Sequence, residues 1–518
     1  MNVVSTLVIF IATLFFPAVV FSQGDPPRIR EIRIDIAPIY TEEQAADSSW
    51  RTFVNNNHVA TRHIVVRRAL LLSEGDVVDE DLIAASERRL RAFKFLNKVE
   101  VKTVPVDANL VDIEVTATDA WSIEPGIDID GGGGLSTITL HLIDHNLLGT
   151  GKKVFGELID ESDVGTSYKF GYSDYQLFGS HWTASARYKT GPLVDSFFLQ
   201  ARRPLYSPDS KWAYGGYAYT ADKIVRRFEN GQESSRFGED EQAAGMFVTR
   251  AYGERFKKLN MKLQLKYLKL DYEALGDQTT GEIPPDQENL TPSINLSKQN
   301  IRWVQHTYLD KQGMTEDKSV GLTYGGRLGY GIPIDDSIEL WDVNAYIIKT
   351  MMPSNNQRVQ LEAAVNSEVV RNTFVTLAAK YHKTSKRHTI ATRLTARLGY
   401  ELDPSRQFTL GADSGLRGYP AREFTGDKMI LMNLEDRQHW GQFSLGPKFN
   451  FGTVVFIDAG NAWQENESID LGELNWSTGF GFRLGSANLP GQPILRVDFG
   501  WAIGEDSFAL TVGTEQQF

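Results

Sequence analysis

The sequence predicts a mostly β protein in which a transmembrane antiparallel β-barrel follows one small α+β domain. Residues 120–518 contain repeated short segments in which apolar and polar side chains alternate, separated by turn residues. Such alternation is typical of strands with one face toward lipid and the other toward a wet lumen. At roughly 25 residues per strand and connection, this length accommodates about 16 strands. No stretch after the N-terminal region approaches the ~20 apolar residues that a spanning helix needs.

The composition excludes several classes of function. The chain has 518 residues and a net charge of −12, which argues against a nucleic-acid partner. It has no cysteine, which excludes disulfides, thiolate metal sites, a cysteine nucleophile and lipobox acylation. No G-x-S-x-G motif occurs, and His141 and His145 lie in a stretch that reads as strand and turn, where their spacing does not favour a metal site. We therefore expect no enzyme activity, no metal and no cofactor.

The N-terminus resembles an export signal. Residues 3–21 form one apolar run, and Val20 and Ser22 fit a signal-peptidase site, which predicts a signal peptide over residues 1–22. The segment before the run has no Lys or Arg, so an uncleaved membrane anchor is the alternative. The barrel pattern downstream favours export.

Residues 25–118 predict the small α+β domain. A strand with isoleucines at 29, 32, 34 and 36 is followed by a polar, insertion-like stretch over residues 41–57. Residues 62–72 have helical character, and Asp79 is a candidate cap for a second helix. Two further strands are expected near residues 99–104 and 110–115, joined by a turn at 107–109. The predicted order is therefore β-α-α-β-β.

This domain resembles a POTRA domain, the periplasmic module that precedes outer-membrane assembly barrels. The resemblance is carried by R-x-A-L-x-L-x-x-G-D at Arg67–Asp76 and by V-D-I-x-V at Val111–Val115. No second copy of the pattern is present in the sequence, so the resemblance implies a single POTRA-like domain in the periplasm.

The ends of the barrel region carry two further signals. Four glycines at 131–134 predict a bend or weakly paired backbone at the first barrel strand. On the last strand, one alternating face resembles the C-terminal sorting signal of outer-membrane barrels; a soluble strand that ends in an aromatic residue by chance is the alternative. The residues of this signal are Phe508, Leu510, Val512 and Phe518.

The most informative stretch is residues 411–437. Arg417 lies in a loop rich in Gly, Asp and Pro, and alternation places Glu435 and Asp458 on the lumen side of two later strands. Because buried ions must be paired, we expect the loop to fold into the barrel and its guanidinium to bind Asp458, with Glu435 nearby. Gly418 would permit the tight turn and Tyr419 would pack against the wall. The alternative is that this contact only braces a loop.

The same residues resemble the BamA/TamA assembly-factor superfamily (the Omp-eighty-five superfamily, also described as bacterial surface antigens). The loop motif [VIL]-R-G-[FY] is matched by Leu416, Arg417, Gly418 and Tyr419, and F-x-D-x-G on the wall is matched by Phe456, Asp458 and Gly460. The words N-x-E-x-R at Asn433–Arg437 and R-x-D-F-G at Arg496–Gly500 also match.

This resemblance implies a protein of the Gram-negative outer membrane that assists insertion, assembly or translocation of polypeptides. Its implied partners are outer-membrane lipids and unfolded client polypeptides; the sequence leaves open whether periplasmic accessory proteins bind and what the oligomeric state is. A passive or plugged channel and a dedicated secretion partner for one passenger are the alternative functions.

Overall fold

The structure is a computed structural model that describes residues 26–307, 315–334, 339–368, 371–385, 387–444, 448–485, 494–514 and 516–518. The predicted signal peptide over residues 1–22 lies outside the described residues. No described helix is long and apolar enough to cross a membrane.

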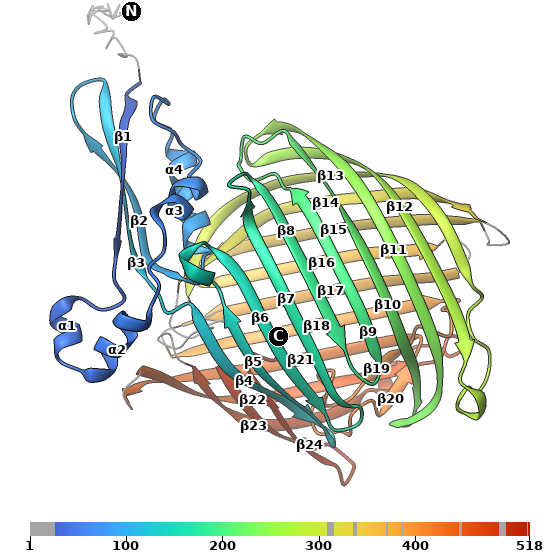
Figure 1. Cartoon of the computed structure of the whole chain (residues 1–518). Helices are drawn as coiled ribbons and strands as arrows, with labels where there is room; N and C mark the ends of the chain where they lie inside the picture. Colours follow the sequence, from blue (N-terminus) through green and yellow to red (C-terminus); the bar gives the residue numbers. More distant parts are fainter. Residues whose placement is uncertain are drawn as a thin grey trace, which may run out of the picture.

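An N-terminal unit of strands and helices precedes the barrel (Figure 1). Its three-stranded sheet has the order β1-β3-β2, with β1 parallel and β2 antiparallel to the central strand. The elements of this unit are β1 (Arg28–Ala37), α1 (Glu42–Ala46), α2 (Ser49–Asn57), α3 (His63–Ala69), α4 (Glu80–Arg91), β2 (Leu96–Pro105) and β3 (Leu110–Asp119).

One apolar cluster holds this unit together. Ile32 on β1, Val66 on α3, Leu90 on α4 and Ile113 on β3 are all buried in it. The helix α4 begins where Asp79 accepts a hydrogen bond from the Leu82 amide. The stretch 41–57, expected to be a polar insertion, contains the two short helices α1 and α2. These helices are too short to show the apolar periodicity by which a helix is recognised in a sequence. The first of them begins at a capping box formed by Thr41.

Twenty of the described strands close into one antiparallel barrel. Each strand pairs with the next along the chain, apart from the step from β18 to β21, and β25 returns to β4. The first ten are β4 (Ile123–Gly132), β5 (Leu135–Asp144), β6 (Lys152–Glu161), β7 (Gly165–Leu177), β8 (Trp182–Thr190), β9 (Val194–Arg203), β10 (Trp212–Glu229), β11 (Gln232–Glu254), β12 (Lys257–Ala274) and β13 (Gln287–Thr307). The others are β14 (Thr315–Pro333), β15 (Leu340–Ser354), β16 (Gln357–Glu368), β17 (Arg371–Thr384), β18 (His388–Tyr400), β21 (Lys428–Ser444), β22 (Lys448–Trp463), β23 (Asn475–Gly485), β24 (Ile494–Ala502) and β25 (Phe508–Gly513).

The expected number of about 16 strands was therefore wrong. It assumed connections that are longer than most of those in the structure. For example, β10 and β11 are joined by only Asn230 and Gly231, whose φ angles of 50° and 74° are those of a tight two-residue hairpin turn. Short turns of this kind leave room for four more strands in the same length of chain.

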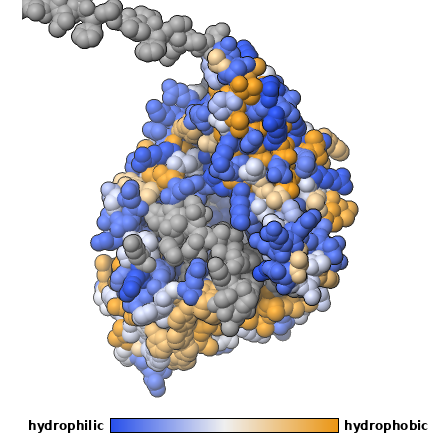
Figure 2. Space-filling model, turned by 90° about the vertical axis from the view of Figure 1, so that its left-hand side faces the viewer, coloured by the Kyte–Doolittle hydropathy of each residue, from blue (hydrophilic) through white to orange (hydrophobic). Residues whose placement is uncertain are grey.

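The two faces of the wall differ in polarity as the alternation predicts. Leu263, Leu394 and Val455 project outward and are exposed, whereas Glu435 and Asp458 point inward and are fully buried. The face viewed from the end that carries the N-terminal unit presents mainly hydrophilic side chains, with hydrophobic ones toward its margins (Figure 2).

Ion pairs hold the N-terminal unit against this end of the barrel. Arg255, in the turn between β11 and β12, donates hydrogen bonds of 2.6 Å to both carboxylate oxygens of Asp79 and also binds Asp209. Farther round the rim, Arg91 of α4 contacts Asp317 of β14 at 3.2 Å. The helices α3 and α4 therefore face the barrel, as Figure 1 shows.

Candidate functional site

The candidate site is built by the long loop between β18 and β21, at the end of the barrel remote from the N-terminal unit (Figure 1). Two short strands, β19 (Phe408–Leu410) and β20 (Phe424–Gly426), pair within the loop. Between them the chain turns sharply, with the Leu416 amide donating to the Gly411 carbonyl at 2.8 Å. Leu416 is fully buried in a small apolar cluster with Leu410 and Leu431. This packing directs the next side chain, Arg417, into the barrel.

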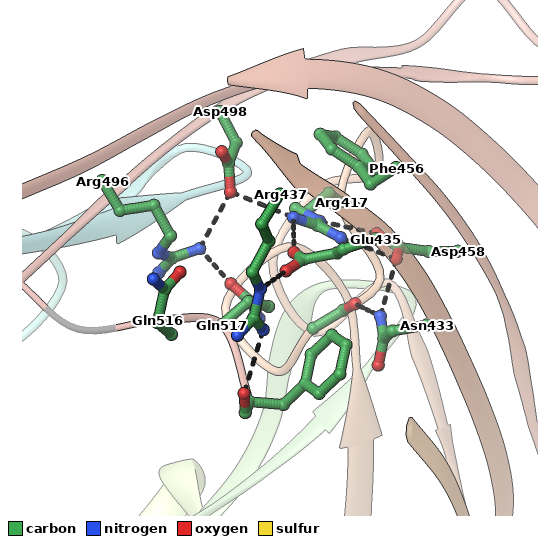
Figure 3. Close-up of polar contacts among 12 residues, drawn as sticks. Arg417, Asn433, Glu435, Arg437, Phe456, Asp458, Arg496, Asp498, Gln516 and Gln517 are labelled. Carbon is green, nitrogen blue, oxygen red and sulfur yellow. Dashed lines mark hydrogen bonds and ion pairs between the residues drawn. The ribbon is translucent and has the colours of Figure 1, made fainter. Parts of the chain in front are cut away.

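The guanidinium of Arg417 binds three carboxylates inside the barrel (Figure 3). Its Nε and Nη2 atoms donate to the two oxygens of Asp458 on β22, at 2.7 and 2.9 Å. Its Nη1 atom donates to Glu435 on β21 at 2.7 Å and to Asp498 on β24 at 3.0 Å. All four side chains are fully buried. A planar fork with five donors can satisfy such a set, which a lysine ammonium cannot match.

Two neighbours orient this arrangement. The guanidinium carbon of Arg417 lies 3.5 Å from the centre of the Phe456 ring, so the planar cation stacks on an aromatic face. Asn433 donates to Asp458 at 2.7 Å and to the Gly415 carbonyl at 2.8 Å. The amide therefore joins the wall carboxylate to the backbone of the loop.

Further arginines balance the charge of the three carboxylates. Arg437 donates to Glu435 at 2.7 Å, and Arg483 and Arg496 both contact Asp498. Each buried carboxylate thus has at least one guanidinium partner. In a low-dielectric interior the loss of one member is costly, because a buried charge then keeps fewer partners or none.

Glycines allow the loop to approach the wall closely. A Cβ atom on Gly418 would lie 2.9 Å from the backbone carbon of Trp501, and its φ of +96° is a conformation that favours glycine. On the wall, a Cβ atom on Gly460 would lie 2.8 Å from Leu410 of the loop. Ser507 donates to the Gly418 carbonyl at 2.8 Å. The loop therefore lies against the backbone of β24 and the connection that follows it.

Tyr419 is the aromatic wedge of this contact. It is buried, its ring packs edge-on against Phe424 at 5.3 Å, and its hydroxyl donates to the Trp476 carbonyl at 3.0 Å. Burial raises the pKa of Tyr419 to about 12, so the hydroxyl remains a donor even at alkaline pH, where an exposed tyrosine ionises.

The remainder of the loop contacts the hairpins that join the first strands of the barrel. The Ala421 amide donates to the Gly133 carbonyl, in the hairpin between β4 and β5, at 2.9 Å. Arg422 binds Asp163, in the turn between β6 and β7, at 2.8 Å. Arg226 of β10 binds the same carboxylate at 2.9 Å. The loop is thus attached both to β21–β24 and to the first strands of the barrel.

The structure places the residues of the C-terminal sorting signal in two different environments. Phe508 and Leu510 lie on the outward face of β25 and are exposed, and Val512 continues that face. The expectation that Phe518 shares this face is corrected by the structure, because β25 ends at Gly513. The Phe518 ring instead lies beside the guanidinium groups of Arg393 and Arg437, at 5.1 and 5.0 Å.

Sequence reasoning identified most of this site but not every partner of Arg417. The R-x-D-F-G motif contains Asp498, but no pattern in the sequence predicted that it binds the guanidinium directly. The bridging role of Asn433 was also missed. The available signal was its place two residues before Glu435 on the inward face. Because both contacts depend on how deeply the loop enters the barrel, no sequence spacing specifies them.

The histidines named in the sequence contact carboxylates. His145 lies 2.7 Å from Glu124, and His141 lies 3.1 Å from Asp128. Within the described ranges, no group of three or more His, Asp or Glu residues is arranged to hold a metal ion.

Comparison with known proteins finds one family model and one relative that match part of the chain. The model for the Omp85 superfamily domain matches residues 349–516, which include the loop and its wall partners. The outer membrane protein assembly factor BamA of Neorickettsia risticii (strain Illinois) is 27% identical over 137 residues, which cover 25% of this chain and 18% of that relative. The resemblance predicted from the loop and wall motifs is therefore confirmed.

Among solved structures, BamA from Haemophilus ducreyi lacking POTRA domains 1–3 aligns with a TM-score of 0.45 and 13% identity, over 95% of this chain and 85% of that one. CdiB from Escherichia coli aligns with a TM-score of 0.46 and 15% identity, over 94% of this chain and 76% of that one.

Proposed function

We propose that this chain, whose residues 349–516 form an Omp85 superfamily domain, is an outer-membrane barrel that assists the insertion or translocation of polypeptides. In this proposal, the N-terminal unit acts in the periplasm as a single POTRA-like domain. Client segments reach the barrel at the junction between its first and last strands. The sequence of steps is capture at the N-terminal sheet, transfer to this junction, and release into the membrane.

The observation that carries the proposal is the weak junction between β25 and β4. Among the described residues, one pair joins these strands, Val512 with Gly131. By contrast, six pairs join β24 to β25 and ten join β4 to β5. Fewer ladder hydrogen bonds make this the position where the wall opens at the lowest cost. An opened strand presents unpaired N–H and C=O groups, to which an incoming strand can add.

The Arg417 site supports this proposal by strengthening the wall beside the junction. Its carboxylates come from β21, β22 and β24, so the loop braces the strands that precede β25. Opening is then confined to one seam, and it also requires the loop to release the hydrogen bond from Ala421 to Gly133 in the β4–β5 hairpin. We define the seam as the junction between β25 and β4.

The N-terminal sheet offers a place for client capture. Within the described residues, β1 and β2 are its two edge strands, because β3 lies between them. An extended polypeptide can add to such an edge through main-chain hydrogen bonds without a specific sequence. This lack of sequence dependence suits a protein that handles several clients.

The outward face of the barrel suits a bilayer. The strand β4 has 10 residues, and a strand of that length tilted by ~45° spans the hydrocarbon core of an outer membrane. Apolar side chains on this face, among them Leu142, Leu263 and Leu434, are exposed in the isolated chain. We place the N-terminal unit on the periplasmic side and the Arg417 loop at the outer surface.

The test is the folding rate of a denatured outer-membrane client in liposomes containing the purified full-length chain, with ion conductance recorded in parallel. Empty liposomes are the control for spontaneous client folding. We expect the chain to accelerate folding. Steady conductance without any effect on client folding would instead assign the protein to the channel class. Transport of a single passenger, with no effect on other clients, would assign it to secretion.

A further inference from the structure

The outer wall far from the seam contains an apolar groove. It spans β11 to β15 and has a volume of about 680 Å³. Its lining includes Met246, Leu263, Pro292, Ile294, Leu328 and Trp341. These side chains belong to the outward face, where Met246 is 64% exposed. The groove thus opens toward the surroundings of the barrel.

An interruption in the strand ladder shapes the groove. The pairs between β13 and β14 pass from Leu290–Ile332 directly to Ser293–Gly329. Pro292 and Tyr330, which lie opposite each other between these pairs, are therefore not paired with each other. Proline has no N–H to donate and is found at bulges or edges of sheets. In a central barrel strand, Pro292 therefore leaves the β13–β14 ladder one N–H donor short beside the groove.

One end of the groove lies close to polar and aromatic side chains. Tyr330 and Trp341 lie against each other there, with ring centres 5.0 Å apart. Farther along the outward face of β12, the Tyr267 hydroxyl donates to Glu288 at 2.9 Å, and Lys269 pairs with Asp271 at 2.7 Å. These groups lie toward the end remote from the N-terminal unit, because the turn at Arg255 forms the other end of β12. Such a belt marks the headgroup level of a bilayer.

We propose that this groove holds one acyl chain of an outer-leaflet lipid as a bound ligand. The inference rests on the membrane location in the proposed function. The groove is continuous with the apolar outer face and ends at the headgroup belt. A lipid can therefore place its acyl chain in the groove while its headgroup lies at the belt. Nearly all of its lining is hydrocarbon or aromatic, so it offers dispersion contacts and few polar partners.

The test uses native mass spectrometry of the full-length chain extracted from vesicles of phosphatidylethanolamine and phosphatidylglycerol. We expect one phospholipid to remain bound after detergent is removed. The Ile294→Trp variant fills the groove and should lower the lipid-bound fraction several-fold. Leu394→Trp is the matched control, because Leu394 is an outward residue of similar exposure on β18, where the ladders to β17 and β21 are continuous. It should retain the lipid.

A second measurement reports whether lipid acyl chains contact the groove while the protein is in the membrane. The chain has no cysteine, so Ile294→Cys and Leu394→Cys each provide a single labelling site for a fluorophore. At a low mole fraction of lipid that carries a nitroxide on its acyl chain, quenching should be greater at position 294 than at 394. Equal quenching at the two sites, or equal lipid retention in the two tryptophan variants, overturns the proposal.

Two other outcomes are also decisive. A dimer that Ile294→Trp dissociates would show that the groove is an interface between copies, which overturns the lipid assignment. A chain that accelerates client folding but retains no lipid overturns this inference and leaves the proposed function standing. A chain that does not insert into vesicles overturns both.

Discussion

Arg417 and Asp458 are joined by two hydrogen bonds, 2.7 and 2.9 Å long, across a separation of 41 residues. Neither side chain is exposed to solvent. The pair fixes the loop between β18 and β21 to the barrel wall at a single, geometrically specific point. Since Glu435 and Asp498 bind the same guanidinium, this one side chain connects three strands of the wall to the loop.

Replacing this arginine tests the contribution of the network to barrel stability. Arg417→Ala should lower stability by about 3–5 kcal/mol, because the buried Asp458 loses its guanidinium partner and Glu435 and Asp498 each lose one of theirs. The measurement is the temperature at which the folded barrel loses its compact migration in a denaturing gel, together with its yield. Unchanged heat resistance would contradict a structural role for the docked arginine.

Arg422→Ala is the matched control for this variant. Arg422 belongs to the same loop and binds Asp163, but both side chains are partly exposed. Although burial by itself would raise the pKa of Asp163, hydrogen bonds from Arg422 and Arg226 keep it lowered. A partly exposed pair contributes about 0–1 kcal/mol, so this variant should remain close to wild type in the same gel assay.

The close approach of the loop to the wall is tested by a pair of glycine substitutions. Gly418 and Gly134 have similar φ angles, +96° and +92°, but only Gly418 has neighbours that an added Cβ would meet. Gly134→Ala should therefore cost only the conformational strain, roughly 1–2 kcal/mol. Gly418→Ala should cost more in thermal unfolding, since the backbone at Trp501 must also move. Equal losses in the two variants would show that the backbone conformation alone requires glycine at position 418.

The contact between the N-terminal unit and the barrel should depend on pH. The hydrogen bond from Arg255 holds the pKa of Asp79 below its ordinary value of 3.8. A lowered pKa in the docked state means that the contribution is complete above the ordinary value and is lost as the pH falls through the lowered one. Docking should therefore weaken only at strongly acidic pH.

This pH dependence can be measured with two labels, because the chain has no native cysteine. One label on α4 and one on the turn between β11 and β12 report the separation of the two parts. Asp79→Asn should show a weaker contact at neutral pH and little change on acidification. If the distance between the labels increases between pH 8 and 6 in the labelled chain that retains Asp79, groups other than Asp79 control the contact.

Much of the site followed from the sequence because alternation assigns each strand residue to one face. The inward positions of Glu435 and Asp458 follow from period two alone. The loop–wall contact was inferred from the need to pair buried charges, because no periodicity connects residues 41 positions apart. Asp498 as a further partner depends on the depth to which Arg417 enters the barrel, which only packing determines.

Other features were not accessible from local patterns. The number of strands depends on turn lengths, and tight hairpins such as the one at Asn230 were underestimated. Phe518 extended the alternating pattern of the last strand in sequence, but the strand ends earlier and the ring meets two arginines. In each case, three-dimensional contacts outweigh the local signal.

The central claim is that the seam between β25 and β4 must open during function, and a disulfide across it tests this claim most directly. A Cβ atom on Gly132 would lie 2.6 Å from the Cγ2 atom of Thr511, which the Thr511→Cys substitution removes, so the two thiols of the Gly132→Cys/Thr511→Cys variant face each other across the seam. Ser185→Cys/Gln200→Cys, across the continuous ladder of β8 and β9, is the matched control. We predict that oxidising the seam variant abolishes accelerated client folding in liposomes, that reduction restores it, and that the control variant is active in both states. Full client folding with the seam cross-linked would contradict the account.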